Sequence, residues 1–508
     1  MIPAPAICKS ARLARDPRFD GRFYTGVLTT GIYCRPVCPA RTPAEDNVRY
    51  FATSASAQDA GFRPCLRCRP ETARRLPEWT LNSQTVIRGL RLIDGGFLLD
   101  HGVDELARRL HISARHLTRL FQQELGTTPK SLAKVRRVHL AKRLIDRSQL
   151  TFSDVAMRAG YGSVRRFNDE IRETFGRTPR GLRSVGRRVS ARGLQSARGL
   201  QSARGLQQAG EVQLQLPVRE PYNRAWVFGF LKQRALPGIE EVVGEVYRRR
   251  LPGAATSEHW LEVAWQDAGL RLTIPAECAL DFGDLLCRVR RVFDLDADCV
   301  VVDSHLSRDP LLTQIVRREP GLRVPGAWDG FETAVRAILG QQVSVARATT
   351  LAAKLCEQFG TGDFPTPQHL MDADIAAIGI PGKRGGAIRE LARAVADGHL
   401  VLDESADHAA LSAALCELPG VGPWTAGYIG MRVARDPDAF VESDWVVLKM
   451  LDVKPAAARQ RAQAWQPWRA YAVMYLWRMA QERRAQTGRL SAGTGAAQTR
   501  PPQVAATT

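Results

Sequence analysis

Four cysteines in two close pairs are the residues of this chain whose types and spacing best suit chemistry. Cys34 and Cys38 lie in GIYCRPVC, and Cys65 and Cys68 lie in FRPCLRC, with 26 residues between the pairs. Two such pairs can place four thiolates tetrahedrally around one Zn²⁺. Two disulfides, or buried free thiols, are the alternative interpretations of the same spacing.

The residues around these cysteines favour a reactive metal site over a purely structural one. Four thiolates on one Zn²⁺ leave two net negative charges, and the metal keeps the sulfurs deprotonated and nucleophilic at neutral pH. Basic side chains crowd both pairs and would face that charge. They are Arg35, Arg41, Arg63, Arg67 and Arg69. A purely structural zinc site is the competing interpretation.

This region resembles the N-terminal domain of the Ada methylphosphotriester-repair proteins. The similarity covers roughly residues 14–72, through GVLTTGIYCRPVCPAR, DNVRYF and AGFRPCLRC. It implies that Cys34 irreversibly accepts a methyl group from a DNA phosphotriester. The residues that it places near the DNA backbone are Thr30, Arg41, Arg63 and Arg67. Pro39 and Leu66 stand where that family commonly has basic residues, which predicts weaker DNA binding.

Methylation of Cys34 would act as an electrostatic switch. It would turn the thiolate into a thioether and remove one negative charge from the cluster. One unit charge at about 5 Å from one phosphate is worth about 3 kcal/mol at an effective dielectric of about 20, before salt screening. Loss of this repulsion should tighten DNA binding.

A helical pattern follows and repeats after about fifty residues. Ser113, Gly126 and Pro129 recur as Ser163, Gly176 and Pro179. Each unit predicts a short helix, a turn and a longer helix that ends at the glycine, with Ser113 as a helix N-cap. The pair resembles the AraC-type DNA-binding domain, whose recognition helices enter successive major grooves. A generic helical bundle is the alternative. The candidate DNA-contacting side chains are Arg115, His116, Arg119, Arg165, Arg166 and Asn168.

A second candidate site lies near the C-terminus. LPGVGPWTA, residues 418–426, follows one predicted helix and opens another. Gly420 and Gly422 would let backbone N–H groups at a helix start approach a phosphate, although an ordinary interhelical turn has the same composition. About twenty residues later, Asp444 precedes WVVLKML. It could cap that helix, serve as a catalytic carboxylate, or do both.

These motifs resemble the helix–hairpin–helix DNA glycosylases, and more specifically the AlkA-type alkylbase glycosylases. The similarity runs from about residue 216 to 480, through EPYNRAWVFGFL, LRVPGAWDGFETAVRAILGQQVSV, LPGVGPWTAGY and WQPWRAYAVMYLW. It implies that Asp444 is the catalytic carboxylate and that an alkali metal ion bridges the hairpin carbonyls to DNA. Gln342 takes the wedge position that fills the gap left by the flipped nucleotide, where AlkA has leucine.

The resemblance also assigns aromatic residues to the base pocket. They are Trp424, Tyr428, Trp477 and Phe230. Taken singly, such residues fit a hydrophobic core equally well. An alkylated purine such as 3-methyladenine or 7-methylguanine is cationic, and cation–π attraction to such a pocket is worth about 1–2 kcal/mol. A nearby carboxylate would then stabilise the oxocarbenium-like sugar while water attacks.

Missing residues narrow the expected activity. Pro423 and Trp424 follow Gly422, so the hairpin lacks the lysine that forms a Schiff base in bifunctional relatives. No cysteine follows Cys416, which excludes the iron–sulfur cluster of other relatives. A PCHR-like alkylguanine-transferase motif is absent as well. We therefore predict base removal without strand cleavage.

Composition agrees with a nucleic-acid partner. The 508 residues carry a formal charge of +20 and have a pI near 10, which favours nucleic acid or an anionic membrane surface. No stretch has the length and apolarity of a signal peptide or a membrane span. We expect a cytoplasmic monomer that binds double-stranded DNA and not membranes, with RNA polymerase as a further candidate partner.

We predict a multidomain α+β protein of six segments. They are a small zinc α/β domain (1–80), an all-α double helix-turn-helix domain (83–185), a basic linker with SARGLQ repeats (186–212), a TBP-like α/β domain (213–320), an all-α helix–hairpin–helix glycosylase domain (321–486) and a disordered tail (487–508). In the TBP-like segment we expect strands at VQLQL, LEVAW, LRLTI and CVVVD.

The predicted function combines alkylation repair with methylation-dependent transcriptional activation. The alternative is a DNA-binding regulator whose zinc is purely structural and whose glycosylase half is inactive.

Overall fold

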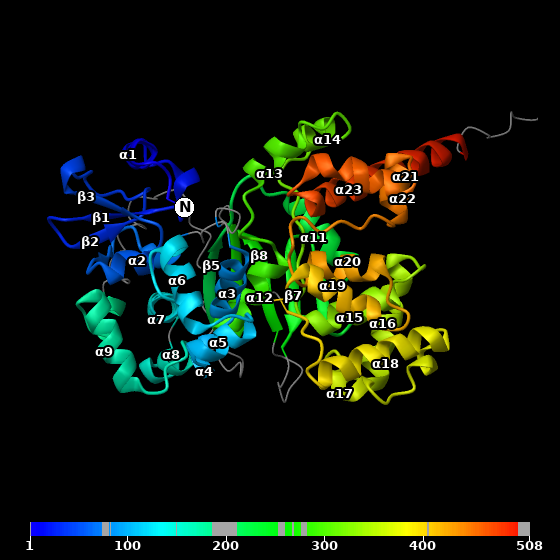
Figure 1. Ribbon diagram of the computed structural model, residues 1–508, viewed down its shortest axis with the longest axis horizontal. Coiled ribbons are helices and arrows are strands. Elements are labelled where there is room, and N and C mark those ends of the chain that lie inside the picture. Colours follow the sequence, from blue (N-terminus) through cyan, green and yellow to red (C-terminus); the bar gives the residue numbers. More distant parts are fainter. Residues whose placement is uncertain are drawn as a thin grey trace, which may run out of the picture.

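The chain folds around two β-sheets that lie apart in space and are covered by helices (Figure 1). The computed structural model describes residues 2–73, 81, 83–148, 150–184, 211–251, 260–266, 269–275, 282–403 and 406–495. The predicted basic linker lies outside the described residues up to position 210, and so does the predicted tail from 496 onwards.

The N-terminal sheet domain (residues 2–73) brings the two cysteine pairs to one edge. Its strand order is β3-β1-β2-β4, and β2 and β4 are parallel, with Tyr33 opposite Pro64. The chain therefore leaves both strands at the same end, at Cys34 and Cys65. The elements are α1 (Pro5–Leu13), β1 (Tyr24–Val27), β2 (Ile32–Cys34), β3 (Val48–Phe51), α2 (Ser54–Asp59) and β4 (Arg63–Pro64).

The paired-helix domain (residues 83–184) has the predicted repeat. Ser113 and Ser163 cap the longer helices by accepting backbone N–H groups, and the helices end at left-handed glycines, Gly126 (φ 67°) and Gly176 (φ 64°). The elements are α3 (Gln84–Asp94), α4 (Phe97–Asp100), α5 (Val103–Arg109), α6 (Ala114–Leu125), α7 (Pro129–Arg147), α8 (Phe152–Arg158) and α9 (Val164–Phe175).

The two N-terminal domains are joined through α7. The hydroxyl of Tyr33, next to Cys34 in β2, lies 3.1 Å from Nε2 of His139. Burial lowers the pKa of His139 to about 3, so its imidazole is neutral in this contact. Thr127 Oγ1 donates to Asp59 at 2.6 Å, and Arg69 pairs with Asp146. The cysteine-bearing sheet is therefore fixed to the helix that links the two helical units.

The second sheet domain (residues 211–318) contains five antiparallel strands in the order β5-β9-β8-β7-β6. Val212, Leu214 and Leu216 of β5 alternate into the core, so this strand includes two residues of the predicted linker. The strands are β5 (Glu211–Pro217), β6 (Glu240–Val243), β7 (Val246–Arg250), β8 (Trp260–Gln266) and β9 (Gly269–Pro275), and the helices are α11 (Arg224–Lys232), α12 (Phe282–Val292), α13 (Cys299–Leu306) and α14 (Thr313–Arg318).

The predicted strand CVVVD is wrong, because these residues begin helix α13. The β-branched run favoured a strand, yet Cys299, Val302 and Leu306 are buried at helical spacing while Val300 is 51 % exposed. Burial of one helical face therefore outweighs the local propensity of the valines.

The hairpin domain (residues 330–495) is helical and shares a hydrophobic core with the second sheet domain, in which Phe228 and Tyr475 belong to one cluster. The elements are α15 (Gly330–Leu339), α16 (Val345–Phe359), α17 (Pro367–Leu370), α18 (Gly382–Ala396), α19 (His408–Glu417), α20 (Pro423–Arg432), α21 (Trp445–Leu451), α22 (Pro455–Arg461) and α23 (Arg469–Gly495). Helix α23 continues through residues 487–495, where a disordered tail was expected. No helix within the described ranges is long and apolar enough to cross a membrane.

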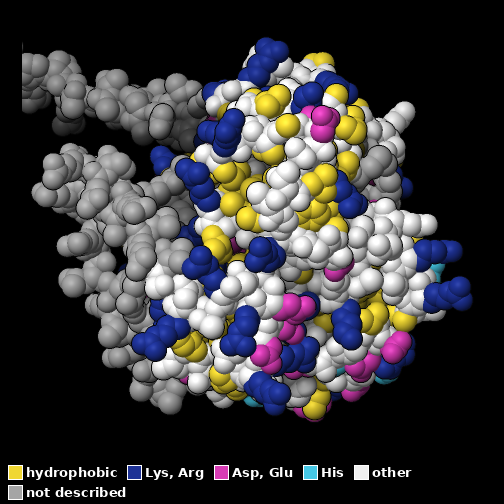
Figure 2. All heavy atoms as spheres, turned by 90° about the vertical axis from the view of Figure 1, so that its left-hand side faces the viewer, with side chains coloured by type: hydrophobic (Ala, Val, Ile, Leu, Met, Phe, Trp, Pro, Cys, Tyr) yellow, Lys and Arg dark blue, Asp and Glu magenta, His cyan; other side chains and the backbone are white. Residues whose placement is uncertain are grey.

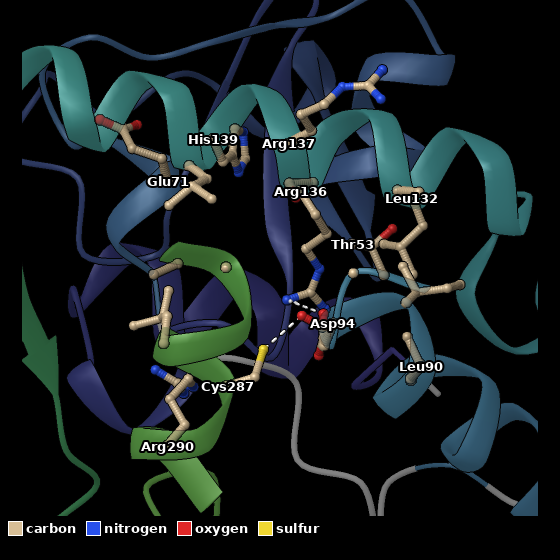
Figure 3. A pocket seen from close by; sticks show the side chains of 18 of the residues that line it. Thr53, Glu71, Leu90, Asp94, Leu132, Arg136, Arg137, His139, Cys287 and Arg290 are labelled. Carbon is tan, nitrogen blue, oxygen red and sulfur yellow. Dashed lines mark hydrogen bonds and ion pairs between the residues drawn. The ribbon is translucent and has the colours of Figure 1, made fainter. Parts of the chain in front are cut away.

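The N-terminal half (residues 2–184) contacts the C-terminal half (residues 211–495) at a junction around a cavity of about 160 Å³. Figure 3 shows Asp94 between Arg136 and Cys287: Arg136 of α7 forms an ion pair with the Asp94 carboxylate at 3.1 Å, and the Cys287 thiol of α12 donates to its backbone carbonyl. Side chains from three helices and both halves thus meet at one acidic residue.

Further polar contacts join the two halves. Arg91, which is buried, donates to the backbone carbonyls of Ala434 (2.6 Å) and Arg435 (3.2 Å). Arg109 pairs with Asp403 at 2.8 Å. A buried charge is costly unless it finds partners, so the two carbonyl contacts of Arg91 favour this docking arrangement.

We predict that the halves stay together after the linker is cut. A site for a specific protease would be introduced into the SARGLQ repeats of the full chain. After cleavage, the fragments should co-elute in size-exclusion chromatography at about 0.1 M salt, where exposed ion pairs are only partly screened. Arg91→Met should weaken this association, because two carbonyls lose their donor.

Arg108→Met is the matched control, since Arg108 is 75 % exposed and pairs with Glu105 of its own helix. Separate elution of the wild-type fragments would contradict the docking arrangement.

Candidate active site and DNA-contacting surface

Asp444 is the N-cap of α21, and its carboxylate accepts three N–H donors. Oδ1 accepts the backbone N–H of Val447 at 2.9 Å and the indole N–H of Trp477 at 3.1 Å, while Oδ2 accepts the indole N–H of Trp424 at 2.9 Å. The residue is only 6 % exposed. Donors to both oxygens offset the loss of hydration of a buried anion. The capping role is confirmed, and it leaves the carboxylate beside an open cleft.

The cleft has a volume of about 1380 Å³ and lies between α11, α15, α20, α21 and α23. The structure brings together in its lining all eight residues that the sequence assigned to this end of the molecule. They are Phe230, Gln342, Gly420, Gly422, Trp424, Tyr428, Asp444 and Trp477.

Three of the predicted aromatic residues form a connected group in the cleft wall. Trp424 and Tyr428 lie one turn apart on α20, and their rings stack at 5.5 Å with an interplanar angle of 15°. Trp477 from α23 lies 6.4 Å from Tyr428, between ring centroids. All three are half-buried, so they pack together and still face the cleft. This arrangement can stack on a flat ligand.

Phe230 has a different environment from the one expected. It is 2 % exposed, and the guanidinium carbons of Arg234 and Arg432 lie 3.7 Å and 5.1 Å from its ring centroid. Phe230 therefore lines the cleft with little exposed surface, and the groups over its ring are two cations.

Arg432 is a cleft residue that the sequence analysis missed. Its Nε and Nη2 donate to the carbonyls of Pro325 (2.7 Å) and Gly326 (2.9 Å), and its Nη1 donates to the Tyr428 hydroxyl at 2.8 Å. Burial raises the pKa of a phenol, but the positive charges of Arg432 and Arg234 outweigh burial and lower the pKa of Tyr428 to about 8. The spacing of Tyr428 and Arg432, four residues apart on a helix, was the available signal.

The predicted wedge lies in a turn that is tied to the hairpin. Gln342 is exposed and has φ of 56°, a left-handed conformation that is rare for a residue with a side chain. Its neighbour Gln341 donates from Nε2 to the Gly420 carbonyl (2.9 Å) and to Thr425 Oγ1 (3.0 Å). Gln341, also missed from the sequence, therefore holds the two loops at a fixed distance.

Trp445 is a third residue that the sequence analysis missed. It follows Asp444, lines the cleft and is 61 % exposed, with Lys449 over its ring at 4.9 Å. Its position in a helical sequence gave no sign of exposure.

The four paired cysteines form the second candidate site. Their sulfur atoms all lie within 4.8 Å of one another, and none forms a disulfide. This donor set fits a tetrahedral Zn²⁺ and rules out the disulfide interpretation here. Cys65 and Cys68 are buried, whereas Cys34 and Cys38 are half-buried. Cys34 is thus a candidate ligand with access to solvent.

Hydrogen bonds among the four sulfur atoms shift the pKa values of the thiols in opposite directions. A hydrogen bond with Cys34 holds the pKa of Cys65 well below its ordinary value. Hydrogen bonds with the other three cysteines raise the pKa of Cys68. The backbone N–H of Arg35 also donates to Cys68 Sγ at 3.4 Å. A cation shared by all four thiolates would remove this competition.

The arginines around the cysteines divide into two groups. Arg35 and Arg69 are structural: Arg35 donates from Nε to Asp20 at 2.8 Å, and Arg69 pairs with Glu71 at 3.2 Å. The predicted DNA-contacting residues of this domain are all exposed, and they are Thr30, Arg41, Arg63 and Arg67.

The predicted recognition-helix arginines are exposed as well. Arg115, Arg119 and Arg165 project from α6 and α9, and Arg166 is exposed while it pairs with Glu170 at 3.1 Å. Figure 2 shows dark-blue Lys and Arg side chains spread over the face that carries the two N-terminal domains, with Asp and Glu in fewer places. This surface suits a polyanion.

Four protein-family models match the chain in sequence order. They are the metal binding domain of Ada (residues 7–71), a helix-turn-helix domain (106–184), the AlkA N-terminal domain (213–329) and the HhH-GPD superfamily of base excision DNA repair proteins (335–470).

Curated relatives match the whole chain or one half of it. The "probable bifunctional transcriptional activator/DNA repair enzyme AlkA" of Mycobacterium tuberculosis H37Rv is 40 % identical over 496 residues, which cover 92 % of this chain and 95 % of the relative. DNA-3-methyladenine glycosylase 2 of Escherichia coli K12 is 35 % identical over 279 residues, 51 % of this chain and 94 % of that protein. Among solved structures, the 3-methyladenine DNA glycosylase of Archaeoglobus fulgidus is 18 % identical, with a TM-score of 0.45, and covers 52 % of this chain and 96 % of its own.

The cleft geometry predicts that Tyr428 ionises before the other tyrosines. A spectrophotometric titration should show one phenolate forming near pH 8. Arg432→Met should move this step up towards the ordinary value of about 10, because the phenolate loses its closest cation. Tyr428→Phe should abolish the step, and an unchanged titration in that variant would refute the assignment.

Proposed function

The chain belongs to the family of bifunctional Ada–AlkA proteins of DNA alkylation repair and transcriptional activation, and from this premise we propose that its C-terminal half hydrolyses the N-glycosidic bond of alkylated bases in double-stranded DNA. The observation that carries the proposal is the buried Asp444 carboxylate, held by two indole N–H groups at the edge of an aromatic cleft. Lesions of the 3-methyladenine and 7-methylguanine type are the proposed substrates.

In the proposed reaction the damaged nucleotide leaves the duplex and its base enters the cleft. The wall of Trp424, Tyr428 and Trp477 stacks on the base, while Gln342 at the exposed turn occupies the space left in the duplex. The bond between C1′ and the base nitrogen breaks, and its electron pair leaves with the base. Asp444 stabilises the positive charge that develops on the sugar. Water adds to C1′ and releases a proton.

The hydrogen bonds of Asp444 favour an electrostatic role over covalent attack. Both carboxylate oxygens accept N–H donors, which lowers their nucleophilicity but keeps the negative charge in place. Pro423 and Trp424 occupy the hairpin positions after Gly422, so no amine is available there to attack the sugar. The proposed product is an abasic site in an intact strand.

We also propose that Cys34 accepts a methyl group from a methylphosphotriester. Its sulfur would form a bond to the methyl carbon, the bond between that carbon and oxygen would break, and the electron pair would stay on the phosphate as a diester. Zn²⁺ on Cys34, Cys38, Cys65 and Cys68 would keep the thiolates deprotonated. The half-buried position of Cys34 and the exposed Thr30, Arg41, Arg63 and Arg67 support this role.

Methyl transfer would strengthen promoter binding by removing one negative charge beside the DNA backbone. The proposed DNA contacts of the paired-helix domain are Arg115, Arg119, Arg165 and Arg166. We further propose that the protein acts as a monomer and contacts RNA polymerase at the promoter. The alkali metal ion expected at the hairpin has no support among the described residues, and the Gly420 carbonyl there accepts the Gln341 amide N–H.

Asp444→Asn should lower base release from duplexes that contain 3-methyladenine or 7-methylguanine by about 10²-fold or more, since the sugar loses its stabilising charge. Asparagine still caps a helix, so the fold should persist. Asp452→Asn, an exposed acid at the other end of α21, is the matched control and should keep full activity. If the wild type frees no base, the regulator interpretation replaces this proposal.

Exposure to methylphosphotriester DNA should add a single methyl group to Cys34, detected by peptide mass spectrometry. Cys416 is exposed but lies outside the cluster, so it should stay unmodified. Methylation of Cys416, or no methylation at all, would refute the acceptor role.

A further inference from the structure

Two of the four arginines that line the proposed base cleft lie beside the ring of Phe230, and the other two are Arg336 and Arg484. Arg234 and Arg432 both line the cleft together with Tyr428 and Asp444. The Arg234 guanidinium carbon lies 3.7 Å from the ring centroid of Phe230, the position where an aromatic face toward the base was expected. A base that enters the cleft therefore meets a cation and its N–H donors as well as aromatic rings.

The two arginines differ in what their donors already bind. Arg432 donates to the Pro325 and Gly326 carbonyls and to Tyr428, so it is committed to the wall. Arg234 donates from Nη1 to the Phe230 carbonyl at 3.3 Å and also hydrogen-bonds to the Tyr428 hydroxyl. A guanidinium has five N–H donors in a rigid plane, which leaves Arg234 able to donate to a ligand.

An ionic network holds the backbone of Arg234 in position. Arg336 donates to the backbone carbonyl of Arg234 and pairs with Glu240 (3.2 Å) and Glu332 (2.8 Å). Arg249 pairs with the same two carboxylates. Burial lowers the pKa of Arg234 to about 10, so the group is still charged at neutral pH.

The charge of the base decides what this cation does to bond breakage. A cationic alkylated purine becomes neutral as it leaves. A nearby guanidinium therefore disfavours its binding and does not stabilise its transition state relative to free enzyme and free DNA. A neutral base with a carbonyl oxygen leaves with negative charge developing on the ring and that oxygen. A positioned cationic donor stabilises that charge in the transition state more than in the ground state.

We propose that Arg234 is a specificity-determining residue that promotes the excision of neutral, carbonyl-bearing bases relative to cationic ones. This inference rests on the proposed glycosylase activity. The C1′–N9 bond breaks, its electron pair goes to the base, and Arg234 stabilises the resulting anion through N–H donation. The base then takes a proton from solvent, and water that adds to C1′ releases one, so atoms and charge balance.

The test compares two purines that both carry a carbonyl at position 6. Hypoxanthine is neutral in DNA, and 7-methylguanine is cationic. Single-turnover excision would be measured for the wild type, Arg234→Met and Arg234→Lys at enzyme concentrations well below saturation, so that each rate refers to free enzyme and free DNA. Arg234→Met should lower the ratio of hypoxanthine to 7-methylguanine excision about tenfold or more, because methionine fills the space without charge or donors. Arg234→Lys should recover most of the ratio.

Arg224→Met is the matched control. Arg224 begins helix α11, which ends two residues before Arg234, and it pairs with Glu245 (3.0 Å) outside the cleft lining. Its ratio should equal that of the wild type, and thermal unfolding should show that all variants fold.

Each remaining outcome counts against a named claim. An unchanged ratio in Arg234→Met would overturn the inference. If excision of both bases fell equally, Arg234 would have a structural role. A wild type that excises 7-methylguanine but no hypoxanthine would overturn the inference and leave the proposed function standing. A wild type that excises neither would refute the proposed function itself.

Discussion

The buried charge of Asp444 is the constraint on which the C-terminal half depends. A carboxylate removed from water needs donors on both oxygens, and here they come from α20, from α23 and from the backbone at the start of α21. Three separate elements must therefore meet at one point. The shared hydrophobic core beneath the cleft holds them there, so charge and packing fix the same geometry.

Arginine serves two purposes in this molecule, and burial separates them. Arg91, Arg249 and Arg432 are committed to carbonyls or carboxylates inside the protein, where they fix loops and domain contacts. The predicted DNA-contacting arginines of α6, α9 and the cysteine-bearing domain face solvent. The high net charge of the sequence therefore overstates the charge available to DNA. Arg234 combines both features, because it bonds to a backbone carbonyl and also lines the cleft.

Local signals predicted much of the fold and both candidate sites. The cysteine spacing, the serine caps and terminal glycines of the helical repeat, and the cap at Asp444 depend on residues close in sequence, and all appear in the structure. Arg234, Arg432 and Gln341 were missed because their roles arise only when distant loops meet. CVVVD was misassigned because the composition of the run favours strands while burial of one face requires a helix.

The central claim is that Asp444 acts through its charge on the sugar, and affinity for a charged sugar analogue tests it most directly. Duplexes would carry either a cationic pyrrolidine or a neutral tetrahydrofuran in place of the damaged nucleotide. Replacement of Asp444 by asparagine should weaken binding of the pyrrolidine duplex at least tenfold and leave binding of the tetrahydrofuran duplex unchanged. Equal effects on both duplexes, or no effect on either, would contradict the account.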